Sequence, residues 1–492
     1  MNGTLRPAFD LAGTLDTISG FMYTYLLVAL LIGVGLYFFV RTRALPLRLF
    51  KEAIRVVTEP PHEEGEVSSF RALMVSTASR VGVGNIAGVA TAVTLGGAGS
   101  VFWMWVIATL GGASAFIEST LAQIYKKQGP HHSYGGPAYY IQMALKQNWL
   151  ATLFASVLIL TYMGGFNLLA SFNVADAFTH YSWANEWTPW IIGAILAVLM
   201  AGSIFGGTRR LTDVTGLLVP VMAIIYLGVG LVVVALNYQN IPAMFSAIFA
   251  GAFDFPAIFG GFAGSAMMYG IKRGLYSNEA GVGSAPNAAA SASVSHPAKQ
   301  GLIQSAGVFV DTILVCSATA FILFNADPEA LKPYWASSDP AGADMTITAL
   351  ESTLGSWAGP IMVVLICVFA GSSVIGNFAY AEVNMDFLTK GKAWGDKLLK
   401  AIVIVSIVLG SVAELKLVWN FADLTMTGMA LINIVSIVML GKWAFGALQD
   451  YLRNRERPFV ATGNPSMPGE LPTDIWVHGG TDLPSGSNAA VS

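Results

Sequence analysis

A short glycine-rich run holds the residues best suited to binding chemistry. Residues 82–88 read Gly-Val-Gly-Asn-Ile-Ala-Gly within a hydrophobic stretch of few charges. Lipid offers a polypeptide backbone no hydrogen-bond partners, so non-helical chain at membrane depth persists only where protein buries it or where it lines a watery cavity. The freed N–H groups of such a break can bind an anionic group, and its freed carbonyls can coordinate a hard cation. We therefore predict that a polar solute contacts Gly82, Val83, Gly84 and Asn85.

A second run of this kind, Gly-Gly-Phe-Ala-Gly-Ser at residues 260–265, occurs in the other half of the chain. Close packing of helices through small residues is the alternative explanation for such glycines. It accounts less well for Asn85, because an amide among glycines in an apolar segment needs hydrogen-bond partners. We predict that Gly260, Gly261, Phe262 and Gly264 line the same site as the first run.

The composition is that of a membrane protein. Of the 492 residues, 54% are hydrophobic and 11% are charged, whereas soluble domains carry about a quarter charged residues. So few cations argue against a nucleic-acid partner. The six histidines fall in predicted loops or near an end, and no nucleotide-binding motif of the GxxxxGK[ST] type occurs. We therefore expect neither an enzyme nor an ATP-driven pump, and no cofactor.

Eleven segments are long and apolar enough to span a bilayer, which takes about 20 residues. They are residues 20–40, 70–94, 99–125, 150–178, 188–206, 212–236, 252–275, 301–325, 356–386, 398–415 and 418–445. Counts of ten or twelve are alternatives, because segments 70–94 and 252–275 are weakly hydrophobic at their glycines. The fold class predicted is an all-α membrane protein.

The distribution of basic residues orients these spans, since cytoplasmic loops carry an excess of Lys and Arg. With eleven spans, one side receives Arg41, Arg43, Arg48, Lys51, Arg55, Lys126, Lys127, Arg209, Arg210, Lys272, Arg273, Lys390, Lys392, Lys397, Lys400, Arg453, Arg455 and Arg457. The other side receives only Arg6, Lys332 and Lys416. The N-terminus is therefore predicted outside and the C-terminus in the cytoplasm.

The two broken spans head two groups of five once the first span is set aside. Five is an odd number, so the groups insert with opposite orientation, and this inverted repeat is typical of secondary transporters that bind solutes at the bilayer midplane. The domain organisation predicted is an N-terminal helix and cytoplasmic linker (1–56), a core (57–445) with repeats at about 70–236 and 252–445, and a cytoplasmic tail (446–492). The tail is rich in Gly, Pro, Ser and Asn and is expected to be largely disordered.

Several longer motifs resemble the signature of the alanine/glycine:cation symporter family. They are residues 82–92 with 96–105, Glu-Ser-Thr-Leu-Ala-Gln at 118–123, Gly-Gly-Pro-Ala-Tyr-Tyr at 135–140, and Arg-Gly-Leu-Tyr-Ser-Asn-Glu-Ala-Gly at 273–281. The resemblance covers roughly residues 15–445. It implies a fold similar to that of the leucine transporter and uptake of a small neutral amino acid, coupled to sodium or protons, across the plasma membrane of a prokaryote.

The chain departs from that family's pattern at the substrate site. Members commonly carry a Gln and an Asn where this sequence has Ala170 and Phe172, and often a Trp where it has Asn377. Losing the Gln removes a hydrogen-bond partner, and losing the Trp enlarges the pocket. Selectivity for alanine therefore does not carry over, and glutamine is an open alternative.

The resemblance also implies a sodium site. Hydroxyls of the ninth span, Ser372 and Ser373, would face the first break and complete a site with the carbonyls of Gly82 and Val83. A serine bonding back to its own helix is the alternative.

The sequence leaves the roles of two charged residues open. Arg80 is either part of a gating ion pair or a cation that snorkels to the interface, and Asp311 lies centrally in the eighth span. The function predicted is sodium-coupled import of a small neutral amino acid by alternating access, with a proton-coupled carrier or a uniporter of the same fold as the alternative.

Overall fold

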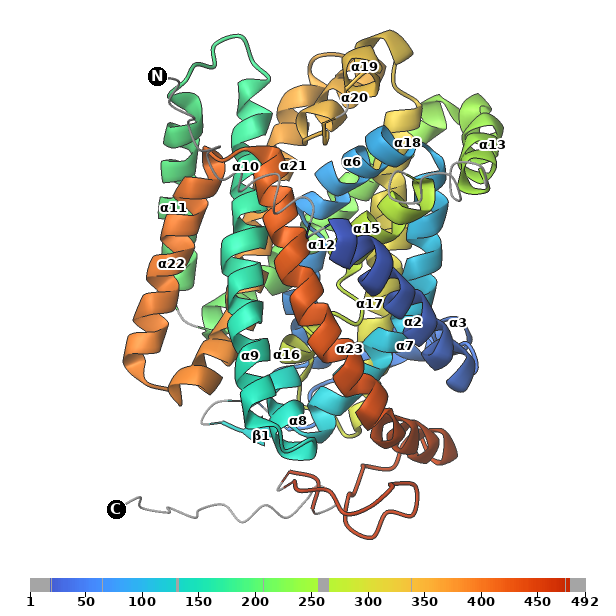
Figure 1. The fold of residues 1–492 in the computed structure, drawn as a ribbon, viewed down its shortest axis with the longest axis vertical. Helices are drawn as coiled ribbons and strands as arrows, with labels where there is room; N and C mark the ends of the chain where they lie inside the picture. The colour runs from blue at the N-terminus through green and yellow to red at the C-terminus, as the bar shows by residue number, and fades with distance from the viewer. Residues whose placement is uncertain are drawn as a thin grey trace, which may run out of the picture.

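The protein is built almost entirely of helices gathered into one bundle (Figure 1). The computed structural model describes residues 18, 20–63, 65–129, 132–206, 208–254, 265–337, 339–473 and 475–477. Six helical units are long and apolar enough to cross a membrane: α7 (Gly99–Ile124), α9–α10 (Asn148–Thr179), most of α12 (Asp213–Leu236), α17–α18 (Pro297–Phe324), α21 (Ala358–Thr389) and α23 (Leu415–Arg453). Shorter apolar helices are Tyr25–Arg41, Val83–Gly96 and Thr188–Ile204.

The remaining elements connect or cover these units. They are α2 (Val28–Arg41), α3 (Leu45–Arg48), α4 (Phe50–Val57), α5 (Ser69–Arg80), α6 (Ala87–Gly96), α8 (Pro137–Ala144), α11 (Thr188–Ile204), α13 (Ile241–Ala252), α15 (Ala266–Asn278), α16 (Ala285–Ala289), α19 (Pro328–Trp335), α20 (Asp344–Leu354) and α22 (Ala393–Ser411). Strands β1 (Lys127–Gln128) and β2 (Ser133–Tyr134) form a small antiparallel hairpin. In Figure 1, α19 and α20 lie at one end of the bundle, here called the α19 end, and the hairpin and α8 at the other, the hairpin end.

Three helical units contain a π-helical turn, where the backbone hydrogen bonds are wider than in an α-helix. These turns are Met22–Leu27 before α2, Leu160–Phe166 between α9 (Asn148–Ile159) and α10 (Asn167–Thr179), and Val310–Cys316 between α17 (Pro297–Phe309) and α18 (Ser317–Phe324). Such turns are frequent at functional sites. The second and third turns both supply side chains to the centre of the molecule.

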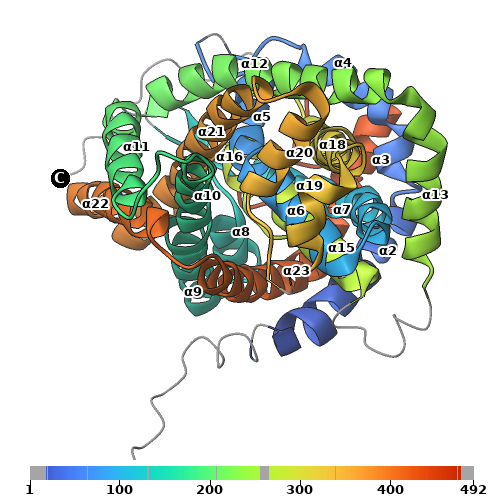
Figure 2. The same ribbon diagram turned by 90° about the horizontal axis from the view of Figure 1, so that it is seen from above.

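Two membrane-depth helices are interrupted. Between α5 and α6 the chain is extended at Gly82 and makes one 3-10 turn, Val83–Asn85. Between α15 and α16 the backbone enters the left-handed region at Glu279 (φ 53°), Gly281 (φ 81°) and Gly283 (φ 94°). Viewed from above, α5, α6, α15 and α16 lie toward the centre, and α11, α12, α13 and α22 lie toward the periphery (Figure 2).

The structure has an interruption after α15 that the sequence analysis did not predict. Gly260, Gly261, Phe262 and Gly264 lie outside the described residues. On either side of these residues, α13 ends at Ala252 and α15 runs from Ala266 to Asn278, three residues beyond the end of the predicted span 252–275. Ser277, Asn278 and Glu279 are fully buried, although their polarity had suggested that the membrane segment ended before them.

The placement of Lys272 and Arg273 with the other basic residues is also wrong. Both side chains pair with Asp423, near the start of α23. Arg453 ends the same helix thirty residues later, about 45 Å away at 1.5 Å per residue. Lys272 and Arg273 therefore lie in the half of the bundle toward the α19 end, where α15 packs against α6 and the first half of α7.

The segment after α23 is ordered as far as it is described. The backbone N–H of Phe459 donates to Ser295 O (2.8 Å), and the Trp476 indole N–H donates to Gln123 O (2.9 Å). Lys126 Nζ lies 5.1 Å from the Trp476 ring centroid. The expected disorder of the tail does not apply to these residues, because its few aromatic side chains find buried positions.

Glu52 ties the N-terminal linker to the end of α23. Its carboxylate accepts hydrogen bonds from Arg55 (2.8 and 3.1 Å), Tyr451 (2.5 Å) and Arg455 (3.2 Å). The Arg55 hydrogen bonds are the largest reason that the pKa of Glu52 falls from 4.5 to about 2. A depressed pKa means that this contribution to stability is present above pH 4.5 and is lost as the pH falls toward 2.

We expect Glu52→Gln to destabilise the protein by about 1–3 kcal/mol at neutral pH, since hydrogen bonds to charged groups are lost. Thermal unfolding in detergent should show a lower midpoint at pH 7 and a smaller gap from wild type as the pH falls below 4.5. Glu329→Gln is the control, because Glu329 is 78% exposed and pairs only with an exposed lysine. Equal midpoints for wild type and Glu52→Gln at pH 7 would contradict this account.

Candidate functional site

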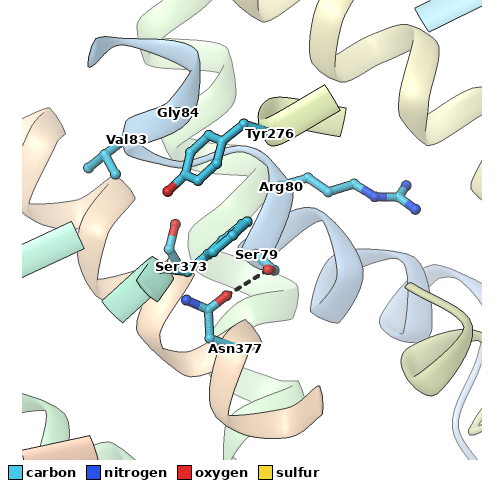
Figure 3. Close-up of a pocket in the computed structure, with 8 residues that line it drawn as sticks. Ser79, Arg80, Val83, Gly84, Tyr276, Ser373 and Asn377 are labelled. Carbon is cyan, nitrogen blue, oxygen red and sulfur yellow. Dashed lines mark hydrogen bonds between the residues drawn. The ribbon is translucent and has the colours of Figure 1, made fainter. Parts of the chain in front are cut away.

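A small enclosed cavity of about 10 Å³ lies where the first break meets α10, α15 and α21. Its lining side chains are Ser79, Arg80, Val83, Phe166, Tyr276, Ser373 and Asn377, with Gly84 contributing backbone. This volume holds about one water molecule and no amino acid. Figure 3 shows Tyr276 facing Ser373 across the cavity, while the guanidinium of Arg80 points away from it.

Asn85 holds the first break in place. Its Oδ1 accepts from the Gly82 N–H (2.8 Å), and its Nδ2 lies 2.7 Å from Asp311 Oδ1 and 2.9 Å from Ser277 Oγ. The Thr319 hydroxyl donates to the Asn85 carbonyl (2.6 Å). The amide predicted to touch a solute thus joins the first break to α15 and to the unit α17–α18.

Asp311, in the π-helical turn, accepts from three neutral donors. Besides Asn85, its Oδ2 accepts from Ser277 Oγ (2.7 Å) and Thr312 Oγ1 (2.9 Å). Asp311 is fully buried and, among the described residues, has no ion pair within 4 Å. Its position in the eighth span is explained by these hydrogen bonds, which join the two interrupted helices.

The two serines predicted for sodium differ in direction. Ser372 Oγ bonds back to Phe369 O (2.9 Å) and contacts Met222 Sδ (3.4 Å). Ser373 Oγ is buried without a hydrogen-bond partner and lies so close to Gly82 that a Cβ there would overlap it. Of the two hydroxyls, that of Ser373 is therefore the one placed to meet a ligand at the break. The carbonyls of Gly82 and Val83, also predicted for sodium, accept hydrogen bonds from the N–H groups of Asn85 and Ile86 (both 3.1 Å).

Neutral hydrogen bonds close the cavity toward the hairpin end. The Ser79 hydroxyl lies 2.7 Å from Asn377 Oδ1, and Asn377 Nδ2 donates to Asn167 Oδ1 (2.8 Å). One turn lower, Tyr380 donates to the Ser76 carbonyl (3.3 Å). Asn377, predicted at the substrate site, thus lies at the floor of the cavity.

Aromatic rings and an ion pair close the cavity toward the α19 end. The Tyr276 ring packs on Phe166 (4.4 Å between centroids) and on Trp419 (4.7 Å). Arg273 lies 3.7 Å above Trp419 and makes two hydrogen bonds to Asp423 (3.2 and 3.3 Å). These groups form a thicker barrier than the hydrogen bonds on the other side.

A large open cavity of about 1250 Å³ leads inward from the hairpin end. Its walls come from the hairpin, α8, α12 and α21, and its lining also includes Val75 of α5, near the Ile375 and Tyr380 side of α21. Val75 lies one helical turn from Ser79, and Tyr380 one turn from Asn377. A single layer of side chains therefore separates this vestibule from the small cavity.

Other predicted residues lie elsewhere. Ala170 is fully buried in α10 and Phe172 is half-buried two residues on, and neither lines the small cavity. Phe166, in the π-helical turn before α10, lines the cavity instead, and its neighbour Asn167 accepts a hydrogen bond from Asn377. The sequence analysis missed Phe166, Tyr276 and Ser79, although Tyr276 was part of a recognised motif.

Arg80 is neither in an ion pair nor at an interface. It is 2% exposed, and its Nη1 donates to Gln304 O (3.4 Å). Its Nε and Nη2 have no hydrogen-bond partner, and no ion pair of Arg80 occurs within the part of the chain that the structure describes.

The oxygen donors suit an alkali-metal ion rather than a transition metal. No group of three or more His, Cys, Asp or Glu side chains that could hold a metal ion occurs among the described residues. A cation at the first break would instead meet carbonyl and hydroxyl oxygens, the ligands that hard cations prefer.

Apolar spanning helices, two interrupted helices and a buried polar cavity between them define a membrane transporter of the leucine-transporter type. Solved structures agree on the fold: MhsT in complex with L-phenylalanine gives a TM-score of 0.55 at 13% identity, covering 79% of this chain and 93% of that one. A manganese transporter of Eremococcus coleocola gives 0.51 at 14% identity, covering 77% and 79%.

The sequence profile of the sodium:alanine symporter family matches residues 9–461, and the chain belongs to that family. It is 41% identical to the probable sodium/glutamine symporter GlnT of Bacillus subtilis (strain 168), covering 88% of this chain and 89% of that one. It is 35% identical to the sodium/alanine symporter AgcS of Methanococcus maripaludis, covering 88% and 95%. The resemblance read from the motifs is confirmed, and the chain is a transporter rather than an enzyme.

We expect Gly82→Ala to reduce transport at least tenfold, because its Cβ would collide with Ser373 Oγ at the break. Gly88→Ala is the matched control in the same run, since the nearest atom to its Cβ is a Trp419 carbon at 3.9 Å. Uptake into proteoliposomes, normalised to folded protein, distinguishes the two. Equal uptake by both variants would show that the close approach at Gly82 is not needed.

Proposed function

We propose that the protein imports a small neutral amino acid together with sodium across the plasma membrane by alternating access. The observation that carries this proposal is the cavity at the first break, which is sealed toward the α19 end and lies one side-chain layer from a vestibule at the hairpin end. The named sodium symporters among its relatives support the substrate class.

The hairpin end is assigned to the cytoplasm. Arg41, Lys126, Lys390 and Arg453 follow or end helices that terminate there, as the positive-inside rule requires. The N-terminus is then outside and the C-terminus inside, in the inner membrane of a prokaryote. On this assignment the structure corresponds to an inward-facing form without substrate.

The order of elements supports a five-plus-five inverted repeat. The first repeat would run from α5 to α12, and the second from α15 to α23. Each begins with an interrupted helix, and α6 and α15 share one half of the bundle while α5 and α16 share the other. This arrangement is the usual basis of rocking-bundle transport.

Helix ends at the breaks provide the charges for both solutes. The C-terminal end of α5 carries a partial negative charge, which with Ser373 favours sodium near the carbonyls of Gly82 and Val83. The N-terminal end of α6 favours the substrate carboxylate near the N–H groups of Gly84 and Asn85. The C-terminal end of α15 favours the ammonium.

Coupling follows if sodium orders the break that also binds the substrate. Each ligand then raises the affinity for the other by the same factor, which corresponds to a coupling free energy of typically about 1–3 kcal/mol. The uncharged lining of Phe166, Tyr276 and Val83 suits a neutral side chain, and the carboxamide of Asn377 offers a partner to an amide such as that of glutamine.

Sodium-driven alanine uptake in proteoliposomes, challenged with each neutral amino acid in turn, tests this function. We expect uptake to require an inward sodium gradient. Strong competition by glutamine together with weak competition by glycine would indicate an enlarged substrate pocket. If uptake is unchanged when potassium replaces sodium, the protein is instead a proton-coupled carrier or a uniporter. The first of these is consistent with a relative described as a putative sodium/proton-dependent alanine carrier. A pH gradient separates these two.

We expect Ser373→Ala to raise the half-saturating sodium concentration about tenfold, the effect of losing about 1.4 kcal/mol of binding. Ser372→Ala should change it less than threefold, because the Ser372 hydroxyl bonds to its own helix. The measurement is the sodium dependence of initial uptake rates at saturating substrate. An unchanged sodium dependence in Ser373→Ala would remove that hydroxyl from the ion site.

A further inference from the structure

Three carboxylates surround the two breaks without an ion-pair partner. Glu118, Glu279 and Asp311 are all fully buried, and none has a cation within 4 Å among the described residues. Charged groups in such surroundings normally pair with an opposite charge or give up their own. Their common feature is that each one fixes part of a break.

Neutral groups satisfy these carboxylates. Glu118 accepts from the Gly281 N–H (3.1 Å) and from Asn433 (2.8 Å), and so holds the second break. Glu279, within that break, accepts from Ser284 (2.7 Å), and its Oε1 lies 2.9 Å from the Ser79 hydroxyl, whose one hydrogen is shared with Asn377 Oδ1. Asp311 accepts from Asn85 of the first break. These donors satisfy hydrogen bonding but contribute no positive charge.

Arg80 supplies the missing positive charge without committing to one acceptor. Arg80 is buried at the end of α5, next to Ser79, whose hydroxyl contacts Glu279, and two residues before the break that Asp311 holds through Asn85. Its guanidinium makes one hydrogen bond, to a carbonyl, and two of its nitrogens have no acceptor. A planar, permanently charged group that serves three acids at once acts as a shared counter-ion.

We propose that Arg80 is a tethered counter-cation for these three carboxylates. Because of its charge, the protein carries one monovalent cation fewer with each substrate than it would if residue 80 were neutral. Without its charge, the buried carboxylates would attract a free cation into the same region, either a second sodium ion or a proton. This inference rests on the proposed function, because it concerns the ions that accompany the amino acid.

The test is the charge moved per substrate by wild type, Arg80→Gln and Arg80→Lys in proteoliposomes. With equal sodium concentration and pH on both sides, a tenfold substrate gradient is balanced by a membrane potential of about 59 mV when one charge moves per substrate. The balancing potential is about 30 mV when two charges move. We expect Arg80→Gln to move one charge more than wild type, and Arg80→Lys to match wild type because it keeps the charge.

Ion gradients identify the extra cation. The reversal potential is measured for both proteins while one ion gradient is varied at a time. If it depends more steeply on the sodium gradient in Arg80→Gln than in wild type, the extra cation is a second sodium ion. If it depends on the pH gradient, the extra cation is a proton. An Arg80→Gln variant that transports with the wild-type charge overturns the proposal. Wild type that shows no sodium-dependent uptake would instead refute the proposed function.

A second set of variants covers an Arg80→Gln protein that folds but does not transport. Glu118→Gln, Glu279→Gln or Asp311→Asn is then added to it, so that one negative charge is removed with the positive one. We expect at least one double variant to recover uptake with the wild-type charge per substrate. If all three stay inactive although size-exclusion profiles and melting show folded protein, the counter-cation role is wrong.

Discussion

The buried backbone of the two breaks is the constraint on which the rest of the structure depends. In lipid every N–H and C=O must find a partner within the protein, and the breaks withdraw several of these groups from helical hydrogen bonding. Asn85 satisfies the Gly82 N–H, and Glu118 satisfies the Gly281 N–H. Side chains able to do this are polar or charged, so carboxylates are needed in the core beside the breaks. The buried carboxylates in turn require a positive charge, which Arg80 supplies.

The two barriers around the cavity differ in the interactions that hold them closed. Toward the α19 end, Arg273 and Asp423 form a buried, doubly hydrogen-bonded pair against Trp419. Separating such a pair costs about 3–5 kcal/mol if either charge stays buried. Toward the hairpin end lie the hydrogen bonds of Ser79 and Asn377, which are worth about 1 kcal/mol each between neutral groups and about 1.5–3 kcal/mol where Ser79 contacts the Glu279 carboxylate. Without ligands the molecule therefore opens more readily toward the hairpin end.

The sequence predicted the helical membrane class, the family and the first break, because long apolar segments and the run at 82–88 are local signals. It did not predict the break after α15. Ser277, Asn278 and Glu279 are polar because α15 ends inside the protein, and hydrophobicity alone reads such residues as the edge of the membrane. The same misreading placed Lys272 and Arg273 at the wrong end. Their partner Asp423 is about 150 residues away, and a contact of that range has no local signature.

The cavity at the first break is too small for any amino acid, so substrate size is not set by a preformed volume. Binding must displace Phe166 and Tyr276, whose rings stack on each other, or move α21 with Asn377. The free energy of this displacement depends on packing around the aromatic pair rather than on the break itself. The proposed selectivity would then depend on how far α10 and α15 yield around the substrate rather than on the break residues alone.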